Sequence, residues 1–157
     1  MNADEMMIFI INEIDFELSQ ANWPAALDKC KQALDLSKQL TNSDPTYSID
    51  LGINWDASRK LFKSAIMSNS ENAIIISYLN EAKKTGQALL DKWSMRINQQ
   101  QKIDITIELS VIDYFIKKAT NNTNLRAFVV HPYPGQQEPG IVFDYKKYPD
   151  APNPGMF

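Results

Sequence analysis

The feature that most constrains the fold is a succession of apolar stripes with helical spacing. In four stretches of the first hundred residues, apolar side chains return every three or four positions, which places them on one face of an α-helix with a period of about 3.6 residues. The stretches are separated by helix-start signals, namely an Asn, an Asp-Pro pair and a Ser-x-x-Glu capping pattern. We predict helices over about 3–20, from Asn22 onward, over 44–67 and over 71–98.

The segment after residue 99 fits two structures. Residues 103–111 alternate apolar and polar side chains, as a strand does, yet the residues up to Ala119 also fit a helical stripe. We predict a fifth helix over about 106–120. Two short apolar runs, 127–130 and 141–143, flank a turn-rich segment and predict a β-hairpin.

These elements predict a mainly α fold, a helical bundle of about five helices with a small C-terminal β-hairpin and an extended Pro-rich tail. Residues 1–122 would form the bundle, and residues 123–157 the hairpin and C-terminal arm of the same domain. A length of 157 residues with an apolar share of 44% suits one globular domain.

Charge and hydropathy narrow the classes of partner. A net charge of -3 gives no general attraction for nucleic acid or an anionic membrane. The longest apolar run, 6–11, is far shorter than the roughly 20 residues that span a bilayer. Acidic Asp4 and Glu5 precede that run, unlike the basic start of a secretory signal. We expect a cytoplasmic protein, or one of the host cytoplasm or virion if the chain is phage-derived.

Few residues offer metal, cofactor or nucleophile chemistry. The chain has one cysteine, Cys30, and one histidine, His131, so a disulfide within the chain is excluded and a multi-thiolate metal site cannot form. Cys30 lies on a predicted apolar stripe, which favours a buried structural role. The five glycines are too dispersed for a phosphate-binding loop. We therefore expect no cofactor and no metal.

Charged pairs at helical spacing are interpreted as solvated faces. The acidic pairs are Glu13 with Glu17 and Asp104 with Glu108, each four positions apart. The short basic stretches are 59–63, with Arg59, Lys60 and Lys63, and 83–84, with two lysines. We expect no nucleic-acid site there, because the acidic first helix offsets these cations.

The stretch Ala21-Asn-Trp-Pro-Ala-Ala-Leu27, followed by Ala33-Leu34 and Asp44-Pro45, resembles the latter part of a tetratricopeptide repeat. The resemblance covers about 25 residues. At the expected spacing of 34 residues the matching positions hold different residues, so the repeat does not recur. We interpret the first two helices as an ordinary helical hairpin.

The segment Arg126-Ala-Phe-Val-Val-His131 resembles the Arg-x4-6-His motif of HEPN-domain ribonucleases, which are small helical proteins. The resemblance implies metal-independent RNA cleavage at a dimer interface, with Arg126 binding phosphate and His131 acting as acid or base. Ala127 stands where the family usually has a polar residue, and the run before Pro132 favours extended chain. The alternative is that His131 is a turn residue beside Pro132.

Two aromatic residues of the first helix, Phe9 and Phe16, lie nearly opposite its main apolar stripe. One interpretation is a central helix buried on two sides, and the other is a partner-binding or oligomer surface. Glu13, Asp15 and Glu17 leave an acidic flank on the same helix, which allows a small immunity or inhibitor protein with an acidic binding face.

The C-terminal arm offers aromatic anchors on a chain that proline keeps extended, so that docking costs little conformational entropy. The leading hypothesis is a non-enzymatic interaction protein or structural subunit that docks on a protein partner, a homo-oligomer or a larger assembly. Its partner-binding residues would be Phe9, Phe16, Tyr145, Tyr148, Pro149, Pro152, Met156 and Phe157.

Overall fold

A computed structural model describes residues 3–43, 51–130 and 138–153 of the chain. In these ranges the elements are α1 (Ala3–Ser19), α2 (Trp23–Ser43), α3 (Leu51–Met67), α4 (Asn72–Lys92), α5 (Gln99–Thr120), the 3-10 helix η1 (Leu125–Ala127), β1 (Val129–Val130) and β2 (Gly140–Ile141). β1 and β2 pair antiparallel, with Val129 opposite Ile141 and Val130 opposite Gly140. The expectation of a mainly helical bundle with a small hairpin is confirmed.

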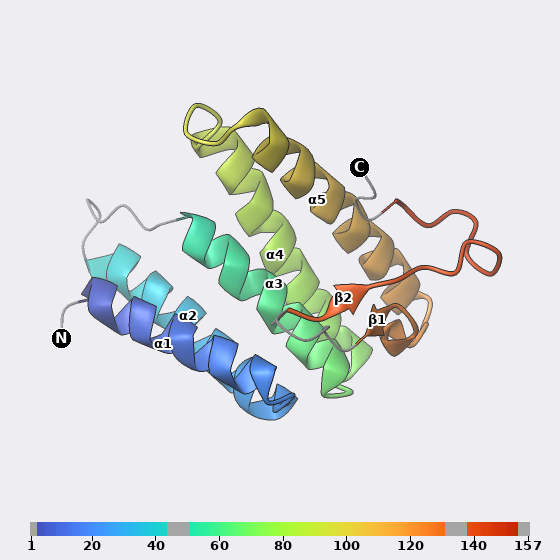
Figure 1. Ribbon diagram of the computed structural model, residues 1–157, viewed down its shortest axis with the longest axis horizontal. Coiled ribbons are helices and arrows are strands. Elements are labelled where there is room, and N and C mark those ends of the chain that lie inside the picture. Colours follow the sequence, from blue (N-terminus) through green and yellow to red (C-terminus); the bar gives the residue numbers. More distant parts are fainter. Residues whose placement is uncertain (1–2, 44–50, 131–137, 154–157) are drawn as a thin grey trace.

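Each helix packs against the next helix in the chain, so the five helices form an up-and-down array (Figure 1). α1 and α2 form one edge of this array, α3 lies in the middle, and α5 lies at the other edge. The hairpin and η1 contact α3 and α5 and cover the end of the array where α3 finishes. Within the described ranges, no helix is long and apolar enough to cross a membrane.

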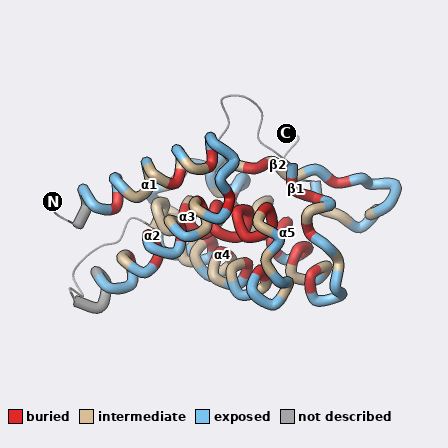
Figure 2. Tube along the Cα trace, turned by 90° about the horizontal axis from the view of Figure 1, so that it is seen from below, coloured by how far each residue is buried: buried red, intermediate tan, exposed pale blue. Residues whose placement is uncertain are grey.

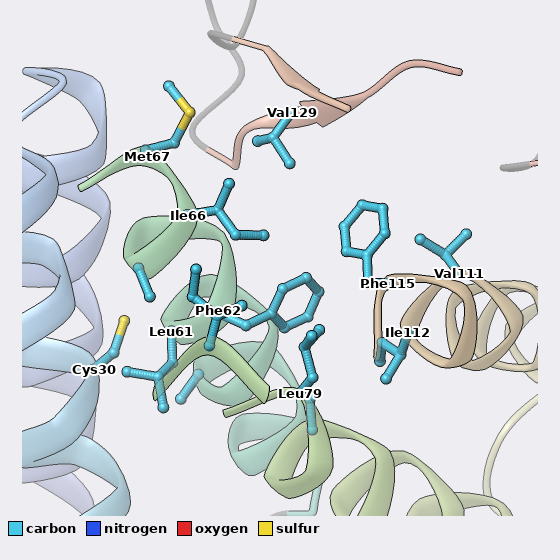
Figure 3. Packing of buried hydrophobic residues seen from close by; sticks show 14 of the residues in the cluster. Cys30, Leu61, Phe62, Ile66, Met67, Leu79, Val111, Ile112, Phe115 and Val129 are labelled. Atoms are coloured by element: carbon cyan, nitrogen blue, oxygen red, sulfur yellow. The ribbon is translucent and has the colours of Figure 1, made fainter. Parts of the chain in front are cut away.

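α3 is the most buried element, as the continuous red tube at the centre of Figure 2 shows. Nearly every residue from Ala57 to Met67 is buried. Phe62 packs edge to face against Phe115 of α5, with ring centroids 6.3 Å apart, and Cys30 reaches the same core from α2 (Figure 3). Because α3 is enclosed on almost every side, its polar and charged side chains need hydrogen-bond or ion-pair partners within the protein.

The boundaries of α4 and α5 differ from the prediction. α4 ends at Lys92 instead of near residue 98, and α5 begins at Gln99 instead of 106. The reason is a capping box. The Asn98 side chain accepts a hydrogen bond from the backbone N–H of Gln101, and the Gln101 side chain accepts one from the backbone N–H of Asn98. This box starts α5 early, so the strand interpretation of 103–111 is wrong.

Two predicted helix starts have different outcomes. Glu71 is the N-cap of α4 but makes no side-chain capping bond, so the Ser68–Glu71 capping box does not form. The Asp44-Pro45 start lies outside the described residues, and the described part of α3 begins at Leu51.

Gly86 of α4 allows neighbouring side chains to approach the helix backbone closely. A Cβ atom there would lie 2.7 Å from Trp55 Cζ3 and 2.9 Å from Leu109 Cδ2. Both distances are below ordinary van der Waals contact. The absence of a side chain thus lets α3 and α5 converge over α4.

We expect Gly86→Ala to lower the free energy of unfolding by about 1–3 kcal/mol, because overpacking against Trp55 outweighs the roughly 1 kcal/mol gain in helix propensity. Chemical denaturation monitored by circular dichroism measures this change. The neighbouring exposed variant Gln87→Ala is the control and should stay within about 0.5 kcal/mol of the wild type. A stabilised Gly86→Ala protein would contradict the close contact.

Candidate functional site

The outer face of α1 exposes large apolar side chains. Phe9 is 54% exposed and Phe16 is 61% exposed, whereas Met7, Ile14 and Leu18 on the opposite face are buried. α1 packs chiefly against α2 and lies along the edge of the array in Figure 2. The interpretation of α1 as a helix buried on two sides is therefore wrong, since its second apolar face is open to solvent.

Acidic residues accompany these phenylalanines. Glu13 stands four positions after Phe9 and three before Phe16, which places it beside both rings on the helix surface. Glu13 pairs with Lys29 of α2, and the Glu17 carboxylate accepts a hydrogen bond from the Asn22 amide at 2.8 Å. α1 contains no lysine or arginine of its own. We call the exposed Met6, Ile8, Phe9 and Phe16 with flanking Glu5, Glu13 and Glu17 the α1 outer face.

Two of the three cations in the basic stretch of α3 are buried and Arg59 is partly buried, so the interpretation of this stretch as a solvated face is wrong. Lys60 is only 8% exposed and Lys63 only 4%. The Lys60 ammonium donates to Asp15 of α1 at 2.7 Å and pairs with Asp56 one turn earlier in α3 at 2.9 Å. This ion pair attaches α1 to the central helix.

The other two cations bind the C-terminal segment. Glu138, just before β2, accepts from Arg59 Nη1 and from Lys63 Nζ, each at 2.9 Å. Arg59 also pairs with Asp56 at 2.8 Å, and Lys63 lies 3.4 Å from Glu108 of α5. We call Arg59, Lys60, Lys63, Asp15, Asp56, Glu108 and Glu138 the α3 ion network, which joins α1, α3, α5 and the hairpin.

The network sets the protonation of its members. Burial alone would raise the pKa of the Glu138 carboxyl, but the charges of Lys63 and Arg59 outweigh burial and lower that pKa below its usual 4.5. Burial opposes the charge of Lys60, yet hydrogen bonds from its ammonium to Asp15 and Asp56 raise its pKa.

Burial also raises the pKa of Cys30 to about 12, so its thiol is protonated and a poor nucleophile at neutral pH.

The C-terminal arm packs on the body of its own chain. The Tyr148 ring contacts Phe128 edge to face with centroids 4.8 Å apart, and the Lys118 ammonium lies 5.4 Å from the Tyr148 centroid. Asp150 accepts from the Tyr114 hydroxyl at 3.1 Å, a contact that joins the arm to α5. Burial and this bond raise the pKa of Tyr114 to about 12.

Two other described residues of the predicted arm, Tyr145 and Pro149, are more exposed than Tyr148. Tyr145 is 46% exposed and donates from its hydroxyl to the Pro152 carbonyl at 3.1 Å. Pro149 is exposed, whereas Met156 and Phe157 lie outside the described residues. Contacts with the same chain therefore hold residues 143–153 in place, and no partner is needed to explain their position.

Arg126 has a structural contact. Its Nη1 donates a hydrogen bond to the Met67 carbonyl at 2.9 Å. This carbonyl lies at the C-terminus of α3, where the negative end of the helix dipole stabilises a cation. His131 lies outside the described residues, so the Arg126 to His131 pair of the ribonuclease hypothesis stays a prediction.

In the described ranges, no three His, Cys, Asp or Glu side chains gather in an arrangement that could hold a metal ion. Comparison of the chain with protein-family models, with curated proteins and with solved structures finds no match. The assignment of a function therefore depends on the surfaces of the molecule itself.

We expect Glu138→Gln to lower the free energy of unfolding by about 2 kcal/mol at pH 7, because it leaves the buried Lys63 and the partly buried Arg59 with less compensating charge. The pKa of Glu138 is lowered by folding, so its contribution is full above pH 4.5 and is lost as the pH falls through the lowered pKa. The difference between wild type and Glu138→Gln should therefore shrink below pH 4.5. Urea denaturation at a series of pH values measures it.

The exposed variant Asp35→Asn of α2 is the control and should follow the wild type within about 0.5 kcal/mol. If the difference in the free energy of unfolding between wild type and Glu138→Gln stays constant down to acid pH, the charge of Glu138 plays no part in its contact with Arg59 and Lys63.

Proposed function

We propose that this protein is a non-enzymatic protein–protein interaction module that docks on its partner through the α1 outer face. The single observation that carries the proposal is the exposure of Phe9 and Phe16, two large rings seven positions apart on one side of an edge helix. Isolated exposed apolar residues are common on proteins, but an aligned aromatic pair on a helix with a free side is typical of a contact surface.

The partner that fits this face best is a helix. α2, α3 and α4 each pack between two helical neighbours, while α1 packs chiefly against one. An amphipathic helix laid along α1 would extend the array by one element and cover both rings. Covering the exposed half of each ring would contribute roughly 1 kcal/mol, about 2 kcal/mol for the pair.

Charge favours a basic partner over a second copy of this chain. Glu5 and Glu17 flank the rings, Glu13 between them pairs with Lys29 of α2, and α1 itself has no lysine or arginine. A symmetric contact between two α1 helices would bring these like charges together, which is unfavourable. A partner helix with lysine or arginine beside its apolar stripe would match both features.

This proposal joins two hypotheses from the sequence on one surface, the aromatic docking surface and the acidic binding face of an immunity or inhibitor protein. It gives the arm a different role. Residues 143–153 contact α5 and Phe128 of the same chain, so in this proposal they stabilise the body, and the docking surface is α1.

A synthetic helical peptide tests the proposal. The probe is a labelled peptide of about 18 residues with leucine on one helical face and lysine elsewhere, and its partner control carries glutamate in place of lysine. We expect the lysine peptide to bind the full chain, and the double variant Phe9→Ser/Phe16→Ser to weaken binding by about tenfold. Fluorescence anisotropy measures both affinities.

The matched variant is Ile74→Ser, which removes an exposed apolar side chain (43% exposed) from α4. It should bind the lysine peptide as the wild type does. The proposal would be overturned if Ile74→Ser and the double variant lost the same affinity for the lysine peptide. It would also be overturned if the wild-type chain bound the lysine and glutamate peptides equally. A chain that is dimeric by light scattering, and becomes monomeric in the double variant, would assign α1 to a second copy and refute the basic partner.

A further inference from the structure

A groove runs between α2 and α4, the two helices that lie on either side of α3 in Figure 1. It consists of two adjoining hollows of about 520 and 370 Å³, and Leu34, Lys38 and Glu81 line both of them. α3 contributes Leu51 to the larger hollow and Leu61 to the smaller one. The two hollows therefore form one continuous depression along α2 and α4.

This groove is basic, although the chain as a whole is acidic. Four lysines and two carboxylates line its hollows, in a chain whose net charge is -3. They are Lys31, Lys38, Lys84, Lys92, Asp35 and Glu81. The groove therefore attracts a negatively charged occupant, unlike the α1 outer face.

The positive charge is concentrated in the larger hollow. Glu81 lies 3.5 Å from Lys38, so these two charges offset each other. Lys84 and Lys92 are exposed and make no ion pair in the part of the chain that the structure describes. Both line the larger hollow, which leaves two positive charges there without a carboxylate.

The spacing of these two charges selects the form of the occupant. Lys84 and Lys92 are eight positions apart on α4, about 12 Å along the helix axis. In an extended chain, side chains at positions i, i+2 and i+4 point to one side and span about 13 Å. Ala88 lies midway between the lysines, and Leu34 and Leu51 join it in the larger hollow, which gives the side chain at i+2 an apolar surface. The matching segment is acidic at i and i+4 and apolar at i+2.

Contacts across the groove disfavour a helix or a nucleic acid. The Lys38–Glu81 pair joins α2 to α4 where the hollows meet, so a helix of about 10 Å diameter would have to break it. A nucleic acid would bring phosphates close to Glu81 and Asp35, which is unfavourable. The Tyr78 ring is partly buried with the Lys31 ammonium 5.8 Å from its centroid, so this ring is not free for base stacking.

We propose that the groove between α2 and α4 binds an extended acidic segment of a protein partner. Its two carboxylates, four positions apart, contact Lys84 and Lys92, and the apolar side chain between them enters the larger hollow. This surface belongs to different helices from the α1 outer face, so the proposal does not depend on docking at α1.

A labelled heptapeptide tests this proposal on the full chain at low salt. In the probe, two glutamates flank a central leucine, a serine separates each glutamate from the leucine, and glycines cap both ends. One control peptide has glutamine in place of both glutamates, and a second has serine in place of leucine. We expect the probe to bind best and Lys84→Gln/Lys92→Gln to weaken it about fivefold, as measured by fluorescence anisotropy.

The matched variant is Lys146→Gln/Lys147→Gln, which removes the same charge from two exposed lysines of the C-terminal arm. It should bind the probe as the wild type does, and so should Phe9→Ser/Phe16→Ser, which alters only the α1 outer face. Because Lys84 and Lys92 are exposed, their variant should fold, which circular dichroism verifies.

The proposal would be overturned if the probe did not bind up to about 5 mM, or if the two lysine double variants weakened it equally. Equal binding of the three peptides would also overturn it. An RNA oligonucleotide that bound more tightly than the probe, and lost affinity in Lys84→Gln/Lys92→Gln, would assign the groove to nucleic acid instead. Self-association that disappeared in the same variant would assign it to a second copy of this chain.

Discussion

The burial of two lysine side chains on α3, with the partly buried Arg59 beside them, is the constraint on which the rest of the structure depends. Lys60 and Lys63 are almost fully enclosed, and removing an ammonium from water costs several kcal/mol unless carboxylates surround it. Those carboxylates come from α1, α5 and the hairpin as well as from α3 itself. The ion network therefore specifies which face of α1 and which end of the hairpin must approach the central helix, and it leaves the opposite face of α1 outside.

The sequence predicts the helices well because each stripe is a local pattern. Ile14, Leu79 and Ile112 recur at helical spacing with other apolar residues of the predicted helices 3–20, 71–98 and 106–120, and all three are buried. The ion network could not be predicted in this way, because Asp15 and Glu138 are 45 and 75 positions or more from the cations they bind. A row such as Arg59, Lys60 and Lys63 has the same local pattern in solvent and in a core, and only tertiary packing distinguishes the two. A local signal for the start of α5 did exist, since Asn98 and Gln101 have capping-box spacing.

The candidate sites were predictable to different degrees. Phe9 and Phe16 stand out in the sequence because they are out of phase with the stripe of Met7, Ile14 and Leu18, although the pattern does not say whether a second helix covers them. The groove between α2 and α4 depends on the packing of both helices on α3 and on which of its lysines meets a carboxylate. Neither is visible in a linear pattern.

The central functional claim is that the α1 outer face is covered by another protein in the cell. Hydroxyl-radical footprinting of Phe9 and Phe16, in the purified chain and in cells that naturally express it, tests this claim most directly. We predict that both rings are oxidised in the purified chain and protected in cells, while the exposed Met95 of the α4–α5 turn is oxidised in both. Equal oxidation of Phe9 and Phe16 in the two conditions would contradict the claim.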